Sequence, residues 1–116
     1  MNTVKIGFKD AYDIAHNGAV FVVSHGYCNS SSIQTIGDNA SVAQNIVVNC
    51  QFKYWTSQAA KDEGYQPMLL ITATGITMFD AYPQSEAEVA DLEAYCLNQL
   101  TTVILPAIDP NMQIVV

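Results

Sequence analysis

His25 and Cys28 are the two side chains whose types and spacing most readily suggest chemistry. A thiolate beside an imidazole can attack an acyl group or another thiol, and residues three apart in a loop can bring their side chains together. No surrounding motif marks an Asn or Asp that would orient the histidine. A small thiol-dependent enzyme using Cys28 is therefore the third of the three functions that the sequence allows.

The same two residues, with His16, Cys50 and Cys96, are the soft ligands that a zinc site would use. Structural zinc requires four ligands, and the chain has no second closely spaced Cys or His pair to complete the set. We therefore expect no metal and no cofactor. Three cysteines without repeated spacing are typical of free thiols, and Cys50 and Cys96 are expected to be small buried apolar residues.

Four carboxylates lie close together at the start of an expected helix, and they are Glu86, Glu88, Asp91 and Glu93. Ser85 with Glu88 three residues later matches a capping box, and anions are stabilised in the first turn of a helix. Helix capping and a solvated face explain all four. As an acidic face, they would be the contact of an inhibitor or immune-evasion protein that binds a basic site on a host protein.

The composition excludes several classes of function. The chain has 116 residues, half of them hydrophobic, which is enough for a single domain spanning residues 1–116. Four lysines, no arginine and eleven carboxylates give a net charge of -7, which argues against nucleic acid and anionic membranes as partners. The first residues contain no long apolar run, so we expect a cytoplasmic protein rather than a secreted one.

Alternation of apolar and polar side chains predicts most of the strands. Residues 45–55 alternate most clearly, residues 19–24 are expected to be buried on both faces, and residues 4–8 and 112–116 are expected to be short strands. Residues 68–79 are expected to form a second long strand with a bulge at Gly75. The Ser- and Asn-rich residues 26–45 predict a long loop or a ragged hairpin.

Capping residues predict the helices. Asp10 is expected to cap a short helical turn over residues 10–16, and Thr56 or Ser57 a second turn over 57–63 that ends at Gly64. One major helix is expected over residues 86–104, ending before Pro106. The sequence thus predicts an α+β fold, a mostly antiparallel sheet of about four or five strands with this helix packed on it.

Candidate interface residues are large and apolar or aromatic. The second half of the expected helix, residues 97–108, is apolar nearly all round, so it must be covered within the domain or by another subunit. Exposed aromatic rings contribute contact area at low entropic cost. The candidates chosen on these grounds are Trp55, Tyr65, Leu97, Ile104 and Ile108.

The absence of the common catalytic motifs predicts a non-enzymatic protein with no catalytic residue. Low charge, long strands and an apolar helix favour a structural or assembly protein that self-associates or binds other protein subunits. An arginine-free chain rich in Asn, Gln, Ser and Thr is similar in composition to small phage virion components of the capsid, neck or tail. Such a virion would be assembled in the cytoplasm.

Overall fold

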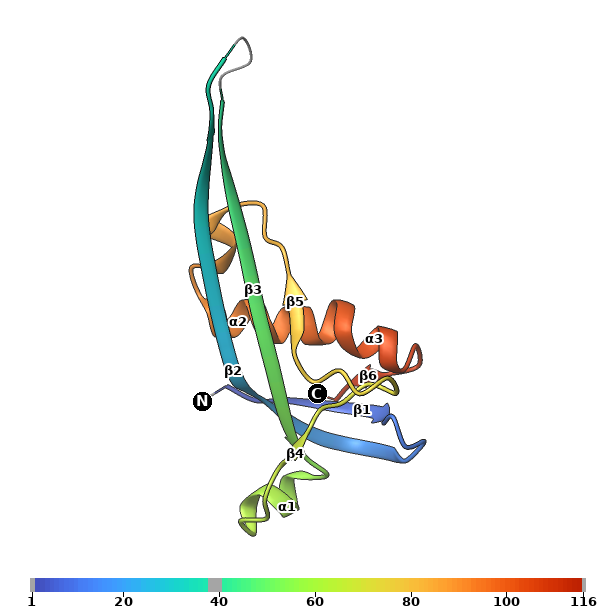
Figure 1. Ribbon diagram of the computed structural model, residues 1–116. Coiled ribbons are helices and arrows are strands. Elements are labelled where there is room, and N and C mark those ends of the chain that lie inside the picture. The colour runs from blue at the N-terminus through green and yellow to red at the C-terminus, as the bar shows by residue number, and fades with distance from the viewer. Residues whose placement is uncertain (1, 38–40, 116) are drawn as a thin grey trace.

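The computed structural model describes residues 2–37 and 41–115, including their side chains except those of 32–35 and 41–44 (Figure 1). Within this part of the chain, an antiparallel sheet has the strand order β4-β3-β2-β1-β6, and β5 pairs with the same edge of β3 as β4 does. The fold is α+β, as predicted.

The elements are, in chain order, β1 (Val4–Lys9), β2 (Ala15–Thr35), β3 (Ser41–Trp55), α1 (Gln58–Asp62), β4 (Met68–Leu69), β5 (Phe79–Ala81), the 3-10 helix η1 (Glu86–Val89), α2 (Leu92–Gln99), the π-helix η2 (Leu100–Ile104), α3 (Leu105–Ile108) and β6 (Gln113–Ile114).

The alternation along β3 is confirmed, and it determines where the core lies. Its apolar face is buried against the C-terminal helix, while the residues between these positions are exposed or half-buried on the opposite face. Side chains alternate between the two faces of a strand, so a period of two buries one face completely. The buried positions are Ile46, Val48, Cys50, Phe52 and Tyr54.

The predicted strand over residues 19–24 is part of the much longer β2. Residues 26–45 are largely strand rather than a long loop, since β2 and β3 pair in regular register out to Thr35 opposite Ser41. Of the two predictions for this segment, the hairpin is closer to the structure, and residues 38–40 lie outside the described part. Pairing of two strands needs no apolar alternation, because backbone hydrogen bonds alone satisfy the polar groups between them.

The segment after β1 is a tight turn, so the predicted helical turn over residues 10–16 is wrong. The Asp10 carboxylate accepts hydrogen bonds from the backbone N–H groups of Tyr12 and Ile14, at 2.9 and 3.0 Å. Asp13 adopts a left-handed conformation with φ of 66°, which Asp tolerates better than most residues. The chain reverses at once, and His16 pairs with Phe8 inside the β1–β2 ladder.

The predicted long strand over residues 68–79 is divided into two short strands, β4 and β5. Between them, the Thr72 hydroxyl accepts from the N–H of Ile76 at 3.0 Å, and Gly75 has φ of 87°. Only glycine adopts this backbone conformation without steric cost, so Gly75 closes a turn instead of forming a bulge. β4 pairs with the end of β3 near Tyr54, and β5 pairs with it near Cys50.

The major helix begins later and ends later than predicted. Ser85 makes no capping hydrogen bond, residues 86–89 form only a 3-10 turn, and Asp91 caps α2 by accepting from the N–H of Ala94 at 3.1 Å. The helix then continues through η2 and α3 to Ile108. Pro106 is tolerated because it lies in the first turn of α3, next to the π-helical register, where its missing N–H costs least.

Two smaller predictions are confirmed. Ser57 caps α1 by accepting from the N–H of Ala60 at 3.1 Å, and Gly64, with φ of 81°, follows the end of that helix. Residues 113–114 form β6, which pairs with β1 at Ile6 opposite Ile114. In the described part of the chain, the helices are too short or too polar to span a bilayer.

The molecule is elongated because the β2–β3 ribbon extends well beyond the helix and β5 (Figure 1). Its principal extents are 60 × 27 × 24 Å, and its radius of gyration is 16.9 Å. A compact chain of this length would have a radius of gyration of about 13 Å. The hydrophobic core is therefore confined to one end, between the sheet and the C-terminal helix.

The packing of the helix on the sheet predicts the effect of shortening a side chain on its buried face. Leu100→Ala should lower the free energy of unfolding by about 2–5 kcal/mol, because Leu100 is fully buried and its loss leaves a cavity. Urea denaturation measures this change. Val103→Ala is the matched control on the same helix; its side chain is 56% exposed, and we expect a change below about 0.5 kcal/mol. Equal losses for both variants would contradict this packing.

Candidate functional site

The outer part of the β2–β3 ribbon is the most unusual feature of the molecule, and its residues 29–35 and 41–47 are called the arm. The pairing of β5 with β3 stops at Val48, and the pairing of β1 with β2 starts at Phe21 and runs away from the arm. Within the described residues, both edges of the arm are therefore without a neighbouring strand. Such edges present rows of N–H and C=O groups that can pair with another chain.

The base of the arm rests on the start of α2. Gly26 lies directly over this helix, since a Cβ atom there would be 3.5 Å from Cys96 Sγ and 3.7 Å from Leu92 Cδ2. Farther out, the Ser30 hydroxyl donates to the Glu86 carboxylate at 2.9 Å. These contacts attach the inner part of the ribbon to the body, so the arm projects from a supported base.

The sequence of the arm lacks the features that usually block edge pairing. Residues 26–52 contain no Lys and no Pro, and Asp38 is their only acidic residue. Charged side chains and prolines on edge strands are common ways to prevent association. Ile36, beside the tip, is 89% exposed. The arm thus combines free edges with near-neutral charge, and the exposed apolar side chain of Ile36 directly follows its first strand.

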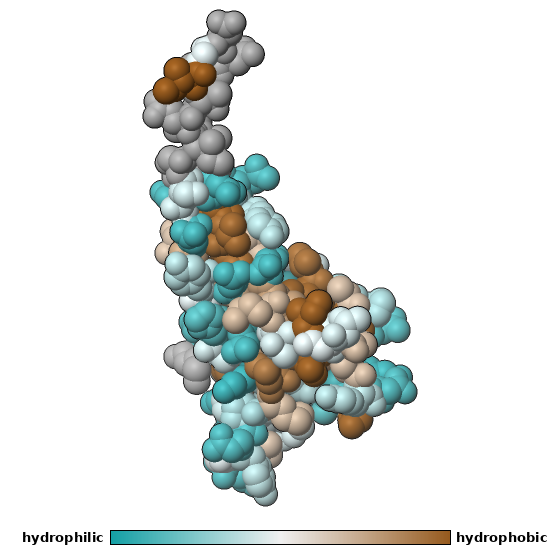
Figure 2. All heavy atoms as spheres, in the orientation of Figure 1, coloured by the Kyte–Doolittle hydropathy of each residue, from teal (hydrophilic) through white to brown (hydrophobic). Residues whose placement is uncertain are grey.

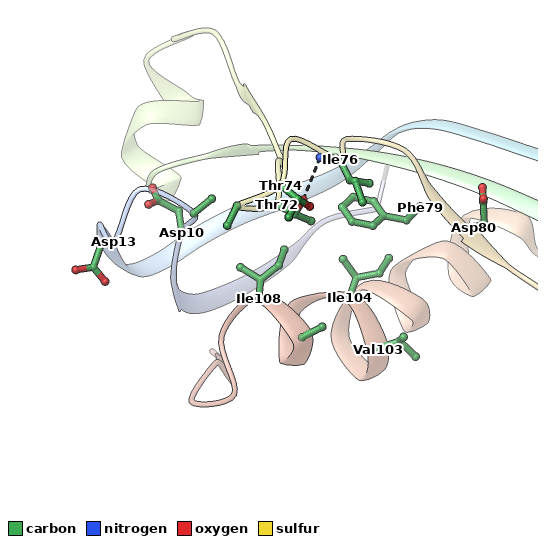
Figure 3. A pocket seen from close by; sticks show the side chains of 13 residues that line it. Asp10, Asp13, Thr72, Thr74, Ile76, Phe79, Asp80, Val103, Ile104 and Ile108 are labelled. Atoms are coloured by element: carbon green, nitrogen blue, oxygen red, sulfur yellow. Dashed lines mark hydrogen bonds between the residues drawn. The ribbon is translucent and has the colours of Figure 1, made fainter.

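A groove of about 610 Å³ lies between the C-terminal helix and the segment around β5 (Figure 3). Ile104 and Ile108 form one wall, Ile76 and Phe79 face them, and carboxylates lie at the two ends. Figure 2 shows hydrophobic side chains gathered on the body, over the region where β5 and the helix lie. The full lining is Asp10, Ala11, Asp13, Thr72, Ala73, Thr74, Ile76, Phe79, Asp80, Val103, Ile104, Ala107 and Ile108. An apolar groove with acidic ends suits an apolar segment that carries positive charge.

A second groove of about 580 Å³ lies on the other side of the turn after β1. Its lining is mainly apolar and aromatic and includes Tyr12, Ile14, Tyr54, Met68 and Leu70. Burial, followed by the charge on Asp10, raises the pKa of Tyr54 to about 12. The phenol therefore stays protonated at neutral pH and does not serve as a base.

Asp10 and His16 form a buried pair between the two grooves. His16 Nε2 donates to Asp10 Oδ2 at 2.8 Å, and the imidazole stacks on Phe8 with ring centroids 5.3 Å apart. Burial acts to raise the pKa of Asp10, but hydrogen bonds from His16 and from the backbone of Ile14 and Tyr12 outweigh it and lower that pKa. A carboxylate–imidazole pair can orient a histidine for catalysis, but every hydrogen bond that Asp10 makes here also stabilises its own turn.

The structure does not bring together His25 and Cys28, the pair that a thiol-dependent enzyme would need. Both lie in β2, opposite Gln51 and Val48 of β3, so a separation of three places their side chains on opposite faces of the sheet. His25 is exposed, whereas Cys28 packs against the core. Among residues 2–37 and 41–115, no group of three or more His, Cys, Asp or Glu is arranged to hold a metal ion.

The four carboxylates of the acidic face lie around η1 and the start of α2. Three accept hydrogen bonds from this chain: Glu86 from Ser30, Glu88 from the N–H of Gln84, and Asp91 from the N–H of Ala94. Glu93 is half-buried in the first turn of α2. The hydrogen bonds of Glu88 and Asp91 fit capping of helical turns, and that of Glu86 fits attachment of the arm to the body.

The predicted interface residues are spread over separate places. Trp55 donates its indole N–H to the carbonyl of Tyr65 at 2.7 Å, and the Tyr65 side chain is exposed near α1. Ile104 is buried and Leu97 packs on the core, while Ile108 lines the groove beside the helix. These five residues are therefore not one continuous surface.

Sequence reasoning allowed a ragged hairpin over residues 26–45, but it did not place the arm or Ile36 among the candidate interface residues. A usable signal was present, since two isoleucines, Ile33 and Ile36, in a Ser- and Asn-rich stretch without Lys or Pro are unusual for a solvated loop. Comparison with protein-family models, curated proteins and solved structures gave no match.

The hydrogen bonds of Asp10 predict a pH-dependent stability. Asp10→Asn should lower the free energy of unfolding at pH 7 by about 1–3 kcal/mol, because the charged acceptor of three hydrogen bonds is lost. The pKa of Asp10 in the folded chain lies below its ordinary value of 3.8, so its contribution is complete above that value. The contribution disappears as the pH falls through the folded pKa. Urea denaturation between about pH 7 and pH 2 should therefore show the two proteins converging in acid.

Asp13→Asn is the control for this series. Asp13 lies in the same turn, its side chain is 86% exposed, and its ion pair with Lys9 at 3.5 Å is a surface pair. Such pairs contribute little to stability, and Asn also tolerates the left-handed conformation found at this position. A difference between wild type and Asp10→Asn that does not depend on pH would exclude this role for Asp10.

Proposed function

We propose that this protein is a non-enzymatic structural subunit that self-associates through its arm, as a small component of a phage capsid, neck or tail would. The observation that carries the proposal is the two-stranded arm, whose edges have no neighbour among the described residues. Two-stranded ribbons in water are at best marginally stable, and at least a third strand or a packed face is needed for independent stability. A neighbouring subunit would supply that strand or face.

The distribution of charge supports contact between arms. Residues 26–52 contain one of the eleven carboxylates of the chain, so most of the net charge of -7 belongs to the body. Two arms can therefore approach without strong repulsion, while the charged bodies stay apart. Assembly in the cytoplasm is part of this proposal, since the three cysteines are free thiols.

An acidic inhibitor is the second candidate function and would bind a basic partner through Glu86, Glu88, Asp91 and Glu93. The hydrogen bonds that three of these carboxylates accept from the chain itself make them less available, so this candidate ranks below assembly. It predicts a monomer or dimer whose binding to its partner weakens with salt. A small enzyme using Cys28 ranks third, because its histidine partner lies on the opposite face of β2.

Shortening the arm tests the proposal. Residues 32–44 are replaced by an Asn-Gly turn between Ser31 and Asn45, which face each other in the ladder. We expect wild type to form a stable oligomer that is insensitive to salt, and the shortened protein to be a folded monomer. Light scattering coupled to size exclusion, at low and high salt and over a range of concentrations, measures both masses.

A point variant avoids a change of chain length. Ile36→Asp places a charge beside the tip of the arm and should raise the dissociation constant of the oligomer at least tenfold, which corresponds to about 1.4 kcal/mol. Tyr65→Ala is the control, because Tyr65 is exposed and its N–H donates to the carbonyl of Ala60 in α1. This helix lies at the opposite end of the molecule from the arm (Figure 1). A wild-type monomer at high micromolar concentration, or equal effects of the two variants, would overturn the proposal.

A further inference from the structure

Two thiols that are distant in the sequence meet inside the core. Cys50 lies on the buried face of β3, Cys96 lies in α2, and their Sγ atoms are 2.8 Å apart. The side chains are 1% and 0% exposed. Neither thiol is a contact in the proposed self-association through the arm, so the chemistry of this pair is independent of that contact.

The position of the two sulfur atoms is close to that of a bonded pair. An S–S bond is about 2.05 Å long, so the two atoms need to approach by less than about 1 Å. Gly26, opposite Cys50 in the ladder, marks where the helix meets the sheet, because a Cβ atom there would lie in ordinary van der Waals contact with Cys96 Sγ, at 3.5 Å. The helix and the strand therefore hold the two thiols within reach of each other.

The two thiols differ in acidity. The hydrogen bond donated by Cys50 lowers the pKa of Cys96, while the same bond and burial raise the pKa of Cys50. A thiolate is the reactive form of cysteine towards oxidants. With the two Sγ atoms 2.8 Å apart, Cys50 is placed to react with Cys96 once that sulfur is oxidised.

We propose that Cys50 and Cys96 form an intramolecular disulfide when the folded protein meets hydrogen peroxide, which links α2 covalently to the base of the arm. In the first step, the Cys96 thiolate attacks one peroxide oxygen, the O–O bond breaks, and the departing hydroxide takes up a proton to become water. The product is a sulfenic acid on Cys96. In the second step, Cys50 sulfur attacks the Cys96 sulfur, and the S–O bond breaks.

Hydrogen peroxide is the only co-reactant that this reaction needs. The oxygen that leaves Cys96 takes up the thiol proton of Cys50 and departs as a second water. Two thiols lose two electrons in total, and one peroxide molecule is reduced to two molecules of water. Peroxide is small enough to reach a buried thiol through brief local openings of the fold.

The bond would tie the helix to the strand on which it packs. It closes a loop between residues 46 apart, which includes α1, β4, β5 and η1. Linking residues this far apart reduces the conformational freedom of the unfolded chain. The oxidised protein should therefore unfold at a higher temperature, by about 10 °C if the bond forms without strain.

The test treats folded wild-type protein with hydrogen peroxide and follows the intact mass. Formation of the bond removes two hydrogen atoms, and peptide mapping without reduction should recover a Cys50–Cys96 linked peptide. Alkylation in denaturant should label one thiol, Cys28, compared with three before oxidation. These wild-type measurements do not depend on whether a variant folds.

Matched variants assign the bond. Cys28→Ser should still lose two hydrogen atoms and gain thermal stability after oxidation, whereas Cys50→Ala and Cys96→Ala, each checked for folding by circular dichroism, should do neither. A bond between Cys28 and either partner, oxidation of Cys96 to sulfinic acid without a cross-link, or three thiols still labelled after treatment would each overturn the proposal. The oligomeric state after oxidation bears only on the arm, so the two proposals can fail separately.

Discussion

The pairing of β3 with its neighbours is the constraint on which the rest of the body depends. β2 lies along one edge of β3, β4 and β5 share the other, and the C-terminal helix covers its apolar face. A shift of this strand by one residue would turn Phe52 and Val48 towards solvent and bring Lys53 into the core. The cost of burying a lysine without a partner is large, so the register is strongly determined near the helix. In the arm beyond Ser30 and Ile46, the two strands are held in register by their backbone pairing.

The parts of the fold that were predictable are those in which local chemistry and burial agree. The alternation of residues 45–55 predicts β3 because one face meets the core, and Ser57 and Gly64 predict α1 because capping is local. The arm was not predictable as regular strand, because the Ser- and Asn-rich residues 26–45 show no alternation of apolar and polar side chains. The extent of the major helix was misjudged at Pro106, because a π-helical register that accommodates a proline depends on packing of the whole helix.

The candidate sites were harder to predict than the elements, since each depends on pairs of residues and not on single ones. Cys50 and Cys96 were each expected to be buried, but their contact follows from the register of β3 and the position of α2 together. His25 and Cys28 show the converse, since a spacing that favours contact in a loop separates the side chains in a strand. Asp10 was expected to cap a helix, and its side chain does accept hydrogen bonds from backbone N–H groups. Because the left-handed conformation of Asp13 reverses the chain, these hydrogen bonds stabilise the turn of a hairpin and not the start of a helix.

The position of β6 has a consequence for the order of folding. β1 is paired on one side with β2, which follows it closely, and on the other with β6, where Ile6 meets Ile114. Contacts between residues far apart in the sequence form slowly, because a long loop must close before they contribute. During synthesis, β1 and β2 can pair early, but the outer edge of β1 stays open until residues 113–114 have left the ribosome. A nascent chain paused before that point would expose this edge of β1 to other nascent chains. Pairing of β6 with β1 covers the edge and so removes this route to misassembly.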